Sequence, residues 1–163
     1  MNLRKDEMRI PILKNTYEIL NEKIAEIEKE IRKTSKVIGA AAEHGDLKEN
    51  AEYHAAREKQ ALLIERVQKF KSYLNCEKVD LSGGVPDTVT FGCSVIVVNK
   101  NTKESHTYNI IGPAEFDLEL LPDMVTIGAP VARLLITKKV SDIVNFKFGS
   151  NDWTGEIIEI RAL

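Results

Sequence analysis

The sequence predicts an α+β protein, in which an antiparallel coiled-coil hairpin of two long helices precedes a small α+β domain. Two observations predict this division. Apolar residues in the first half recur at alternating spacings of three and four, which is the spacing of a coiled-coil seam. In the second half, short alternating runs rich in β-branched residues replace that repeat. We expect the hairpin to occupy residues 1–78 and the α+β domain to occupy residues 79–163.

The first predicted helix begins near Leu13. No proline or glycine interrupts residues 12–38, so we expect a helix of roughly 30 residues, about 45 Å long at 1.5 Å per residue. Its apolar positions fall on two tracks, Leu13, Leu20, Ile27, Thr34 and Ala41, and Tyr17, Ile24, Ile31 and Ile38.

A second seam follows, with spacings of three and four throughout: Tyr53, Ala56, Gln60, Leu63, Val67, Phe70 and Leu74. A short connection between two seams of similar length favours a hairpin within one chain over a dimer of two chains. Small residues on both sides of the connection should let the helices approach closely, namely Ala40, Ala41, Ala42, Ala51, Ala55 and Ala56.

After residue 78 the pattern changes. The segment SGGVPD at 82–87 is a loop by composition. Four runs are typical of strands, at residues 89–98, 105–111, 143–148 and 153–160, and a short helix with proline at its start is expected at 130–136.

Composition excludes several classes of protein. No apolar run approaches the roughly 18 residues that a membrane span needs, and we expect neither a signal peptide nor contact with a membrane. Cys76 and Cys93 form no CxxC pair, so we expect free thiols in a reducing cytoplasm rather than a zinc site. A net charge of -2 argues against a general nucleic-acid coat, which would be strongly basic.

The connection between the helices, EHGDLKEN at residues 43–50, is unusually polar, with one apolar residue. One interpretation is a capped turn. Asp46 would be the N-cap of the second helix with Glu49 at N3, where carboxylates suit the positive end of the helix. Gly45 would permit a turn with positive φ.

The other interpretation of EHGDLKEN is a metal site. On a helix, Asp46 and Glu49 would lie on one face with Cβ atoms about 5–6 Å apart. Two carboxylates are a weak Mg²⁺ site by themselves, because magnesium usually completes its octahedron with waters and phosphate oxygens. The pair would therefore form half of a site, which a partner that supplies phosphate would complete.

EHGDLKENAEYHAAREKQ, at residues 43–60, resembles the tip segment of the bacterial Gre transcript cleavage factors, nearest to the GreA branch of that family. FGCSVIVVN (91–99), TYNIIG (107–112) and APVARLLITKK (129–139) resemble landmarks of the family's C-terminal domain. The resemblance covers nearly the whole chain in order. It implies that residues 79–163 form an FKBP-like α+β domain that docks on polymerase.

The resemblance also implies a function. Gre factors bind bacterial RNA polymerase at the rim of its secondary channel and insert the hairpin toward the active centre. Asp46 and Glu49 match the two acidic tip residues that help hold a second Mg²⁺ there, so that the polymerase cleaves backtracked nascent RNA near its 3′ end. We therefore expect a monomeric, cytoplasmic transcription elongation factor that is not a nuclease by itself.

Other positions carry weaker expectations from the same resemblance. Arg57 would contact RNA or polymerase near the tip, or would be a solvated helix residue. Pro130 and Val131 would dock on polymerase, or would only begin a short helix. In the second half of the chain, Thr137 and Ser141 depart from the family pattern, since they stand where a turn usually has glycines.

Further residues near the tip have open roles. Arg32, Lys33 and Lys36 form a basic cluster that is an RNA-facing patch or an ordinary charged helix face. His44 and His54 match the family motif and are expected to be turn or surface residues. Ala42 stands where the family usually has a basic residue.

Three other functions compete with transcript cleavage. A Gre-like channel binder would inhibit or modulate transcription without stimulating cleavage. A prolyl isomerase would need an aromatic-lined pocket in the second half. A purely structural coiled-coil protein would not bind polymerase.

Overall fold

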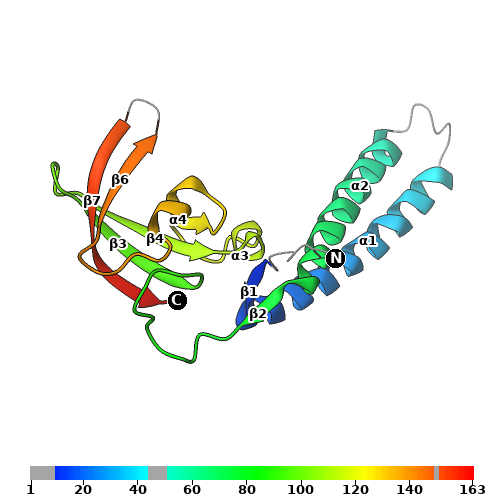
Figure 1. Ribbon diagram of the computed structural model, residues 1–163. Coiled ribbons are helices and arrows are strands. Elements are labelled where there is room, and N and C mark those ends of the chain that lie inside the picture. Colours follow the sequence, from blue (N-terminus) through cyan, green and yellow to red (C-terminus); the bar gives the residue numbers. More distant parts are fainter. Residues whose placement is uncertain (1–9, 44–50, 149–150) are drawn as a thin grey trace, which may run out of the picture. The chain divides into compact units, whose positions relative to one another are not determined.

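The computed structural model describes residues 10–43, 51–148 and 151–163 (Figure 1). It contains two compact units: Tyr17–Cys76 is the helical hairpin, and residues 10–16 with Glu77–Leu163 form the sheet domain. The predicted α+β class is confirmed. The elements follow along the chain as β1 (Pro11–Leu13), α1 (Lys14–Glu43), α2 (Ala51–Ser72), η1 (Tyr73–Asn75), β2 (Glu77–Val79), β3 (Cys93–Asn99), β4 (Ser105–Ile111), α3 (Pro113–Asp117), β5 (Met124–Thr126), α4 (Pro130–Leu135), β6 (Ile143–Phe148) and β7 (Asn151–Ala162).

Within the hairpin, α1 and α2 lie side by side and run antiparallel, as predicted (Figure 1). The seams account for the burial. In α2 the residues that are not exposed are all seam positions, Tyr53, Ala56, Gln60, Leu63, Val67 and Phe70. In α1 every seam residue from Tyr17 to Ala41 is buried or half-buried. The spacing of apolar residues therefore determines which stripe of each helix faces its partner.

The small residues beside the connection contribute less than expected. Ala41 and Ala56 are buried, but Ala40, Ala42, Ala51 and Ala55 are exposed. Close packing of the helices near the tip thus depends on one small residue from each helix.

The sheet domain is built on a five-stranded sheet in the order β5-β4-β3-β7-β6. The β4–β5 pair is parallel and the other pairs are antiparallel. The short helix α4 packs against this sheet. The core contains Val89, Cys93, Val95, Val97, Ile110, Ala132, Leu135, Val144, Phe146, Ile157 and Ile160.

The predicted strand at 89–98 begins too early. The strand β3 starts at Cys93, because Gly92 turns the chain with φ +81°. Val89 is buried to 1% exposure although it lies before the strand, and its N–H donates to Lys138 O at 2.8 Å. Its apolar character reflects burial in a loop rather than membership of a strand. The strands at 105–111 and 143–148 were predicted correctly, and β7 is longer than expected.

Four short elements were not predicted. They are the strands β1 and β2, which pair in parallel, the helix α3 and the strand β5. Strands of three residues and a helix of five are too short to show a period of 2 or 3.6. None of the described helices is long and apolar enough to cross a membrane. Cys76 and Cys93 form no disulfide with one another.

Candidate functional site at the hairpin tip

The two predicted metal ligands, Asp46 and Glu49, lie outside the described residues, as does His44. The structure describes the helix ends that flank them. The helix α1 runs for 30 residues and ends at Glu43, and α2 is described from Ala51. In the sequence, residues 44–50 stand between these two helices, of which α1 is about 45 Å long.

The donor set of the connection suits a shared magnesium ion. Carboxylate oxygens are the hard ligands that Mg²⁺ prefers, and two of them leave most of an octahedron for waters and phosphate oxygens. Among the described residues, no group of three or more His, Cys, Asp or Glu side chains could hold a metal ion. That finding does not include residues 44–50.

Arg57 lies on α2, shortly after the connection. Its side chain is exposed, and no acidic residue in the described part of the chain forms an ion pair with it. An exposed guanidinium is available for a phosphate or a carboxylate. This exposure fits both expectations for Arg57. The residue could contact RNA or polymerase, and it could equally be a solvated helix residue.

A groove of about 450 Å³ lies between the helices near the tip. Its lining combines small or apolar side chains with two lysines and two glutamates, as Glu30, Lys33, Thr34, Val37, Glu52, Ala55, Ala56 and Lys59. Lys59 Nζ pairs with Glu30 Oε1 at 2.6 Å. The hydrogen bond from Lys59 lowers the pKa of Glu30. The groove therefore carries balanced charge rather than a strong field of one sign.

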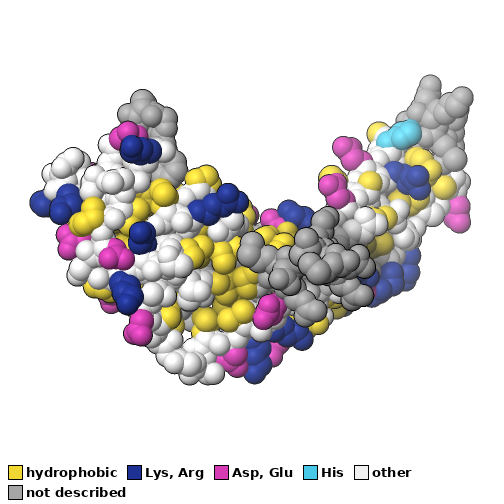
Figure 2. All heavy atoms as spheres, in the orientation of Figure 1, with side chains coloured by type: hydrophobic (Ala, Val, Ile, Leu, Met, Phe, Trp, Pro, Cys, Tyr) yellow, Lys and Arg dark blue, Asp and Glu magenta, His cyan; other side chains and the backbone are white. Residues whose placement is uncertain are grey.

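The exposure of the basic cluster fits both an RNA-facing patch and an ordinary charged helix face. Arg32, Lys33 and Lys36 are all exposed. Figure 2 shows basic and acidic side chains interspersed along the visible face of the hairpin, with hydrophobic side chains between them. His54 is exposed as well, and its ring makes an edge contact with Tyr53 at 5.5 Å. No continuous basic surface for nucleic acid is visible on this face of the described residues.

Pro130 and Val131 begin α4, as their positions in the sequence indicate. Ala129 is the N-cap in an extended conformation, and Pro130 occupies the first turn, where its missing N–H costs nothing. Pro130 is exposed, whereas Val131 is half-buried against the core. The start of a helix is enough to explain both residues, and their docking role stays a prediction.

The two departures at Thr137 and Ser141 have a structural consequence. Both residues adopt left-handed backbone, with φ of +70° and +73°. Glycine adopts this region freely, but a side chain with a Cβ is strained there, especially a β-branched one. Backbone hydrogen bonds hold the strained residues in place, from Thr137 N to Val89 O at 2.8 Å and from Ser141 N to Ile157 O at 2.7 Å.

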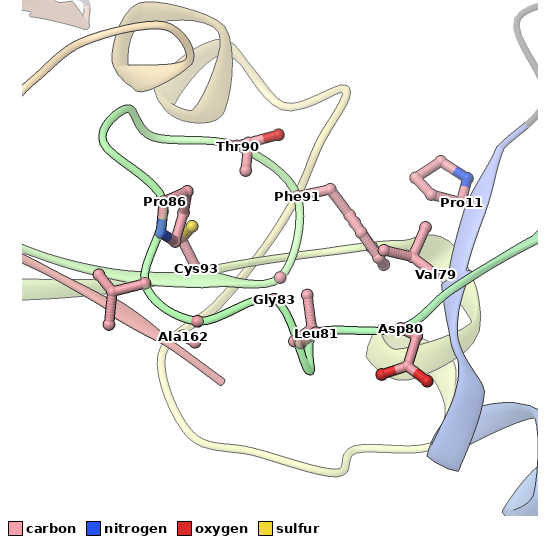
Figure 3. A pocket seen from close by; sticks show the side chains of 13 residues that line it. Pro11, Val79, Asp80, Leu81, Gly83, Pro86, Thr90, Phe91, Cys93 and Ala162 are labelled. Atoms are coloured by element: carbon pink, nitrogen blue, oxygen red, sulfur yellow. The ribbon is translucent and has the colours of Figure 1, made fainter.

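The sheet domain also contains an apolar cavity of about 370 Å³ beside residues 79–93 (Figure 3). Phe91 and Val79 point toward one another across it, and Cys93 belongs to its wall. Burial raises the pKa of the Cys93 thiol, which makes it a poor nucleophile at neutral pH.

The aromatic residues of the sheet domain mostly stack on one another. Phe146 and Trp153 lie 4.1 Å apart with nearly parallel rings, and Tyr108 stacks on Phe146 at 6.2 Å. Phe146 is fully buried. These rings therefore contribute to core packing, which gives little support to the prolyl isomerase interpretation.

Sequence reasoning missed one buried carboxylate, Glu115. Its side chain is 0% exposed and accepts hydrogen bonds from Leu13 N at 2.8 Å and from Gly112 N at 3.0 Å. The sequence does contain a signal for the start of this helix, GPAE at residues 112–115. In it, Pro113 begins α3 and the glutamate is the N3 residue.

Two family models and several relatives match this chain. The model of the family "Transcription elongation factor, N-terminal" matches residues 10–79, and that of "Transcription elongation factor, GreA/GreB, C-term" matches residues 84–162. The transcription elongation factor GreA of Haemophilus influenzae is 39% identical over 160 residues, covering 95% of this chain and 99% of that protein. GreA of Trichlorobacter lovleyi is 38% identical over 154 residues, covering 93% of this chain and 96% of that protein.

Among solved structures, the GreA factor homolog 1 (Gfh1) of Thermus thermophilus matches with a TM-score of 0.43 and 17% identity, over 94% of this chain and 99% of that one. The two family models together span most of the chain, and the GreA relatives align over nearly their whole length. The chain belongs to the GreA/GreB family of transcription elongation factors.

Proposed function

We propose that this protein binds bacterial RNA polymerase through the secondary channel and stimulates hydrolytic cleavage of backtracked nascent RNA. One observation carries the proposal: in a chain of the GreA/GreB family, α1 ends at Glu43 and the antiparallel α2 is described from Ala51, and Asp46 and Glu49 stand between them in the sequence. The polymerase supplies the active centre. The protein is then a cofactor of the polymerase and not a nuclease by itself.

The proposed chemistry assigns Asp46 and Glu49 to one task. Their carboxylate oxygens would be ligands for a Mg²⁺ ion shared with the polymerase and the RNA. When bound, such an ion lowers the pKa of a water and stabilises the negative charge that develops at the cleaved phosphate. The two side chains would also orient that water by accepting hydrogen bonds from it.

The other proposed contacts are divided between the two units. Pro130 and Val131 would dock the sheet domain on polymerase, and Arg57 would contact RNA or polymerase beside the tip through its exposed guanidinium. One copy of the hairpin fills one channel, so we propose a monomer. We also propose that the protein is located in the cytoplasm, where the bacterial polymerase works.

The test is transcript cleavage by backtracked elongation complexes. The release rate of short 3′ RNA fragments would be compared between wild type, the Asp46→Asn/Glu49→Gln double variant and Glu52→Gln. Glu52 is the matched control, since it is an exposed carboxylate in the first turn of α2. We expect the double variant to lose at least about 100-fold in rate, while Glu52→Gln stays near wild type.

Binding to polymerase should be measured in parallel, and it should change little in either variant. A wild-type protein that binds polymerase but does not stimulate cleavage would support the inhibitory channel binder instead. If the double variant cleaves at the wild-type rate, the metal role of Asp46 and Glu49 is wrong. Failure to bind polymerase would contradict the proposal as a whole.

A further inference from the structure

The segment from α3 to β5, residues 116–124, exposes apolar side chains and carries only acidic charge; we call it the α3–β5 surface. No Lys or Arg occurs from residue 104 to residue 132. Phe116 on α3 is 48% exposed. The apolar residues that follow it are half-buried, namely Leu118, Leu120, Leu121 and Met124. The exposed ring therefore belongs to a run of partly exposed apolar residues, whereas a single exposed apolar residue would need no explanation.

Two carboxylates of the α3–β5 surface are available to a partner. Glu119 and Asp123 are exposed, and no described Lys or Arg forms an ion pair with either of them. Charges of one sign on a surface attract a partner of the opposite sign and repel one of the same sign. The α3–β5 surface thus suits a basic protein segment and repels the phosphates of nucleic acids and lipids.

The backbone of the α3–β5 surface is held in one conformation. Glu119 and Asp123 both have left-handed backbone, with φ of +53° and +49°, which is uncommon for residues other than glycine. Glu119 N donates to Phe116 O at 3.1 Å. At the other end, Asn109 N donates to Asp123 O at 3.0 Å and Asn109 Nδ2 donates to Pro122 O at 2.7 Å. A surface that is already ordered loses little conformational entropy on binding.

The α3–β5 surface is also close in the fold to the predicted docking residues. Strand β5 contacts both α3 and α4. Helix α4 begins with Pro130 and Val131, which the proposed function assigns to polymerase. A partner that binds the start of α4 therefore comes near the carboxylates that precede β5.

We propose that the α3–β5 surface docks on a basic segment of RNA polymerase, with the Phe116 ring packed on apolar atoms of that segment and with Glu119 and Asp123 facing its Lys or Arg side chains. This inference rests on the proposed function and adds the chemistry of the surface that polymerase must present. In such an interface the aromatic ring supplies affinity, and the charges around it speed association.

Association kinetics with bacterial core RNA polymerase test the two carboxylates. The variant is Glu119→Gln/Asp123→Asn, which keeps the size of both side chains. Its matched control is Glu104→Gln/Asp152→Asn, which removes the same two charges from exposed residues at the opposite end of the sheet. We expect the variant to associate about three- to tenfold more slowly than its control at low salt, and the difference to vanish at about 0.5 M salt.

Equilibrium affinity tests the ring. Phe116→Ala should raise the Kd for polymerase by about tenfold or more. The factor concentration that gives half of the maximal cleavage rate should rise by the same factor, while the maximal rate stays unchanged. Ile158→Ala is the matched control, because Ile158 is also 48% exposed in the sheet domain, and it should bind like wild type.

Photo-crosslinking identifies the partner segment. The full chain with p-benzoylphenylalanine in place of Phe116 would be irradiated in its complex with polymerase, and the cross-linked peptide would be sequenced. We expect a polymerase peptide with net positive charge. An acidic peptide would overturn this inference.

The other outcomes separate this inference from the proposed function. If wild type binds polymerase and Phe116→Ala binds equally well, or if the charge variant and its control associate equally fast, this inference fails and the proposed function stands. The same holds if Phe116→Ala loses binding only in proportion to its unfolded fraction in a thermal melt. A wild type that does not bind polymerase would overturn the proposed function, and this inference with it.

Discussion

The hairpin and the sheet domain bury their residues in different ways. In α2, only Ala56, Val67 and Phe70 are buried, and the opposite face of the helix is in solvent. In the sheet domain, strands from across the sheet contribute side chains with no exposure at all, among them Val95, Val97, Ile110, Phe146 and Ile157. The hairpin is stabilised by a narrow seam of contacts between its helices, and the sheet domain by a closed core of fully buried side chains.

This difference bears on function. A seam holds two helices together through one stripe of each helix, so polar residues outside that stripe cost the fold little. A closed core holds its surface rigidly and suits a docking unit. The two units would thus separate chemistry from docking, and the variants below test whether each unit is stabilised by its own contacts.

The largest effect is expected for Phe70→Ala in the seam. Phe70 is 1% exposed, and Arg66 lies over its ring at 5.4 Å. Removing a buried phenylalanine costs about 3–5 kcal/mol. We expect faster hydrogen exchange throughout α1 and α2 with little change in the β-strands, because the core of the sheet domain contains no hairpin residue.

Leu62→Ala is the control for that variant, since Leu62 lies on the same helix with 62% exposure. It should change stability by less than about 0.5 kcal/mol. If Phe70→Ala made hydrogen exchange faster in both units equally, the hairpin and the sheet domain would unfold as one cooperative unit. That result would contradict the difference between the two units.

The next largest effect is expected for Gly155→Ala in the sheet. A Cβ at Gly155 would lie 2.8 Å from the Trp153 ring and 3.0 Å from the Phe146 ring, and closer still to Val97. Overpacking of this kind costs about 1–3 kcal/mol. Thermal unfolding should show the loss, whereas Gly128→Ala, where a Cβ meets nothing within 4 Å, should stay near wild type.

A smaller effect, of opposite sign, is expected at the turn after α4. Thr137→Gly should stabilise the sheet domain by about 0.5–1 kcal/mol, because relief of the left-handed strain exceeds the entropy that glycine loses on folding. Ser141→Gly should act in the same direction. Thr137→Ala is the control, since alanine keeps the strain. A destabilised Thr137→Gly protein in denaturant titration would contradict the strain at this position.

The smallest effect is the pH dependence of the hairpin. Hydrogen bonds from Lys71 and Lys59 lower the pKa of Glu28 and Glu30 below their ordinary value of 4.5. The folded-state pKa values are depressed, so the pairs stabilise the hairpin above pH 4.5, and the stabilisation disappears as the pH falls through the lowered values. Both pairs are exposed, so the effect is slight.

Thermal melts followed by circular dichroism at pH 7 and pH 2.5 test this, with Lys59→Met as the comparison. The small difference between wild type and Lys59→Met at pH 7 should vanish at pH 2.5. A difference that persists at pH 2.5 would show that Lys59 acts through its aliphatic packing instead.

The hairpin could be predicted well from the sequence, because one physical rule governs it. A spacing of three and four puts residues on one stripe of a helix, and the structure buries or half-buries Leu20, Ile27, Val67 and Phe70 as that rule requires. The sheet domain follows no single rule. The run beginning at Val89 has strand composition, yet Gly92 turns the chain before the strand begins.

The candidate ligands come from a sequence motif and stay predictions, because they lie outside the described residues. Asp46 and Glu49 stand out because two acids in an otherwise polar turn resemble a known motif. Glu115 does not stand out, because its meaning comes from Leu13, which is distant in sequence. Contacts of this kind depend on tertiary structure, and a local pattern cannot reveal them.

The central claim is that the tip provides ligands for magnesium while the sheet domain binds polymerase. The most direct test of this claim is the magnesium dependence of transcript cleavage. The cleavage rate of a backtracked elongation complex would be measured against Mg²⁺ concentration at saturating factor, for wild type and for Asp46→Asn. We predict that Asp46→Asn needs at least about tenfold more Mg²⁺ to reach half of its maximal rate, with unchanged affinity for polymerase. The account would be contradicted if both proteins needed the same Mg²⁺ concentration to reach half of their maximal rates, whatever those rates are. A loss of polymerase binding in Asp46→Asn would contradict it as well.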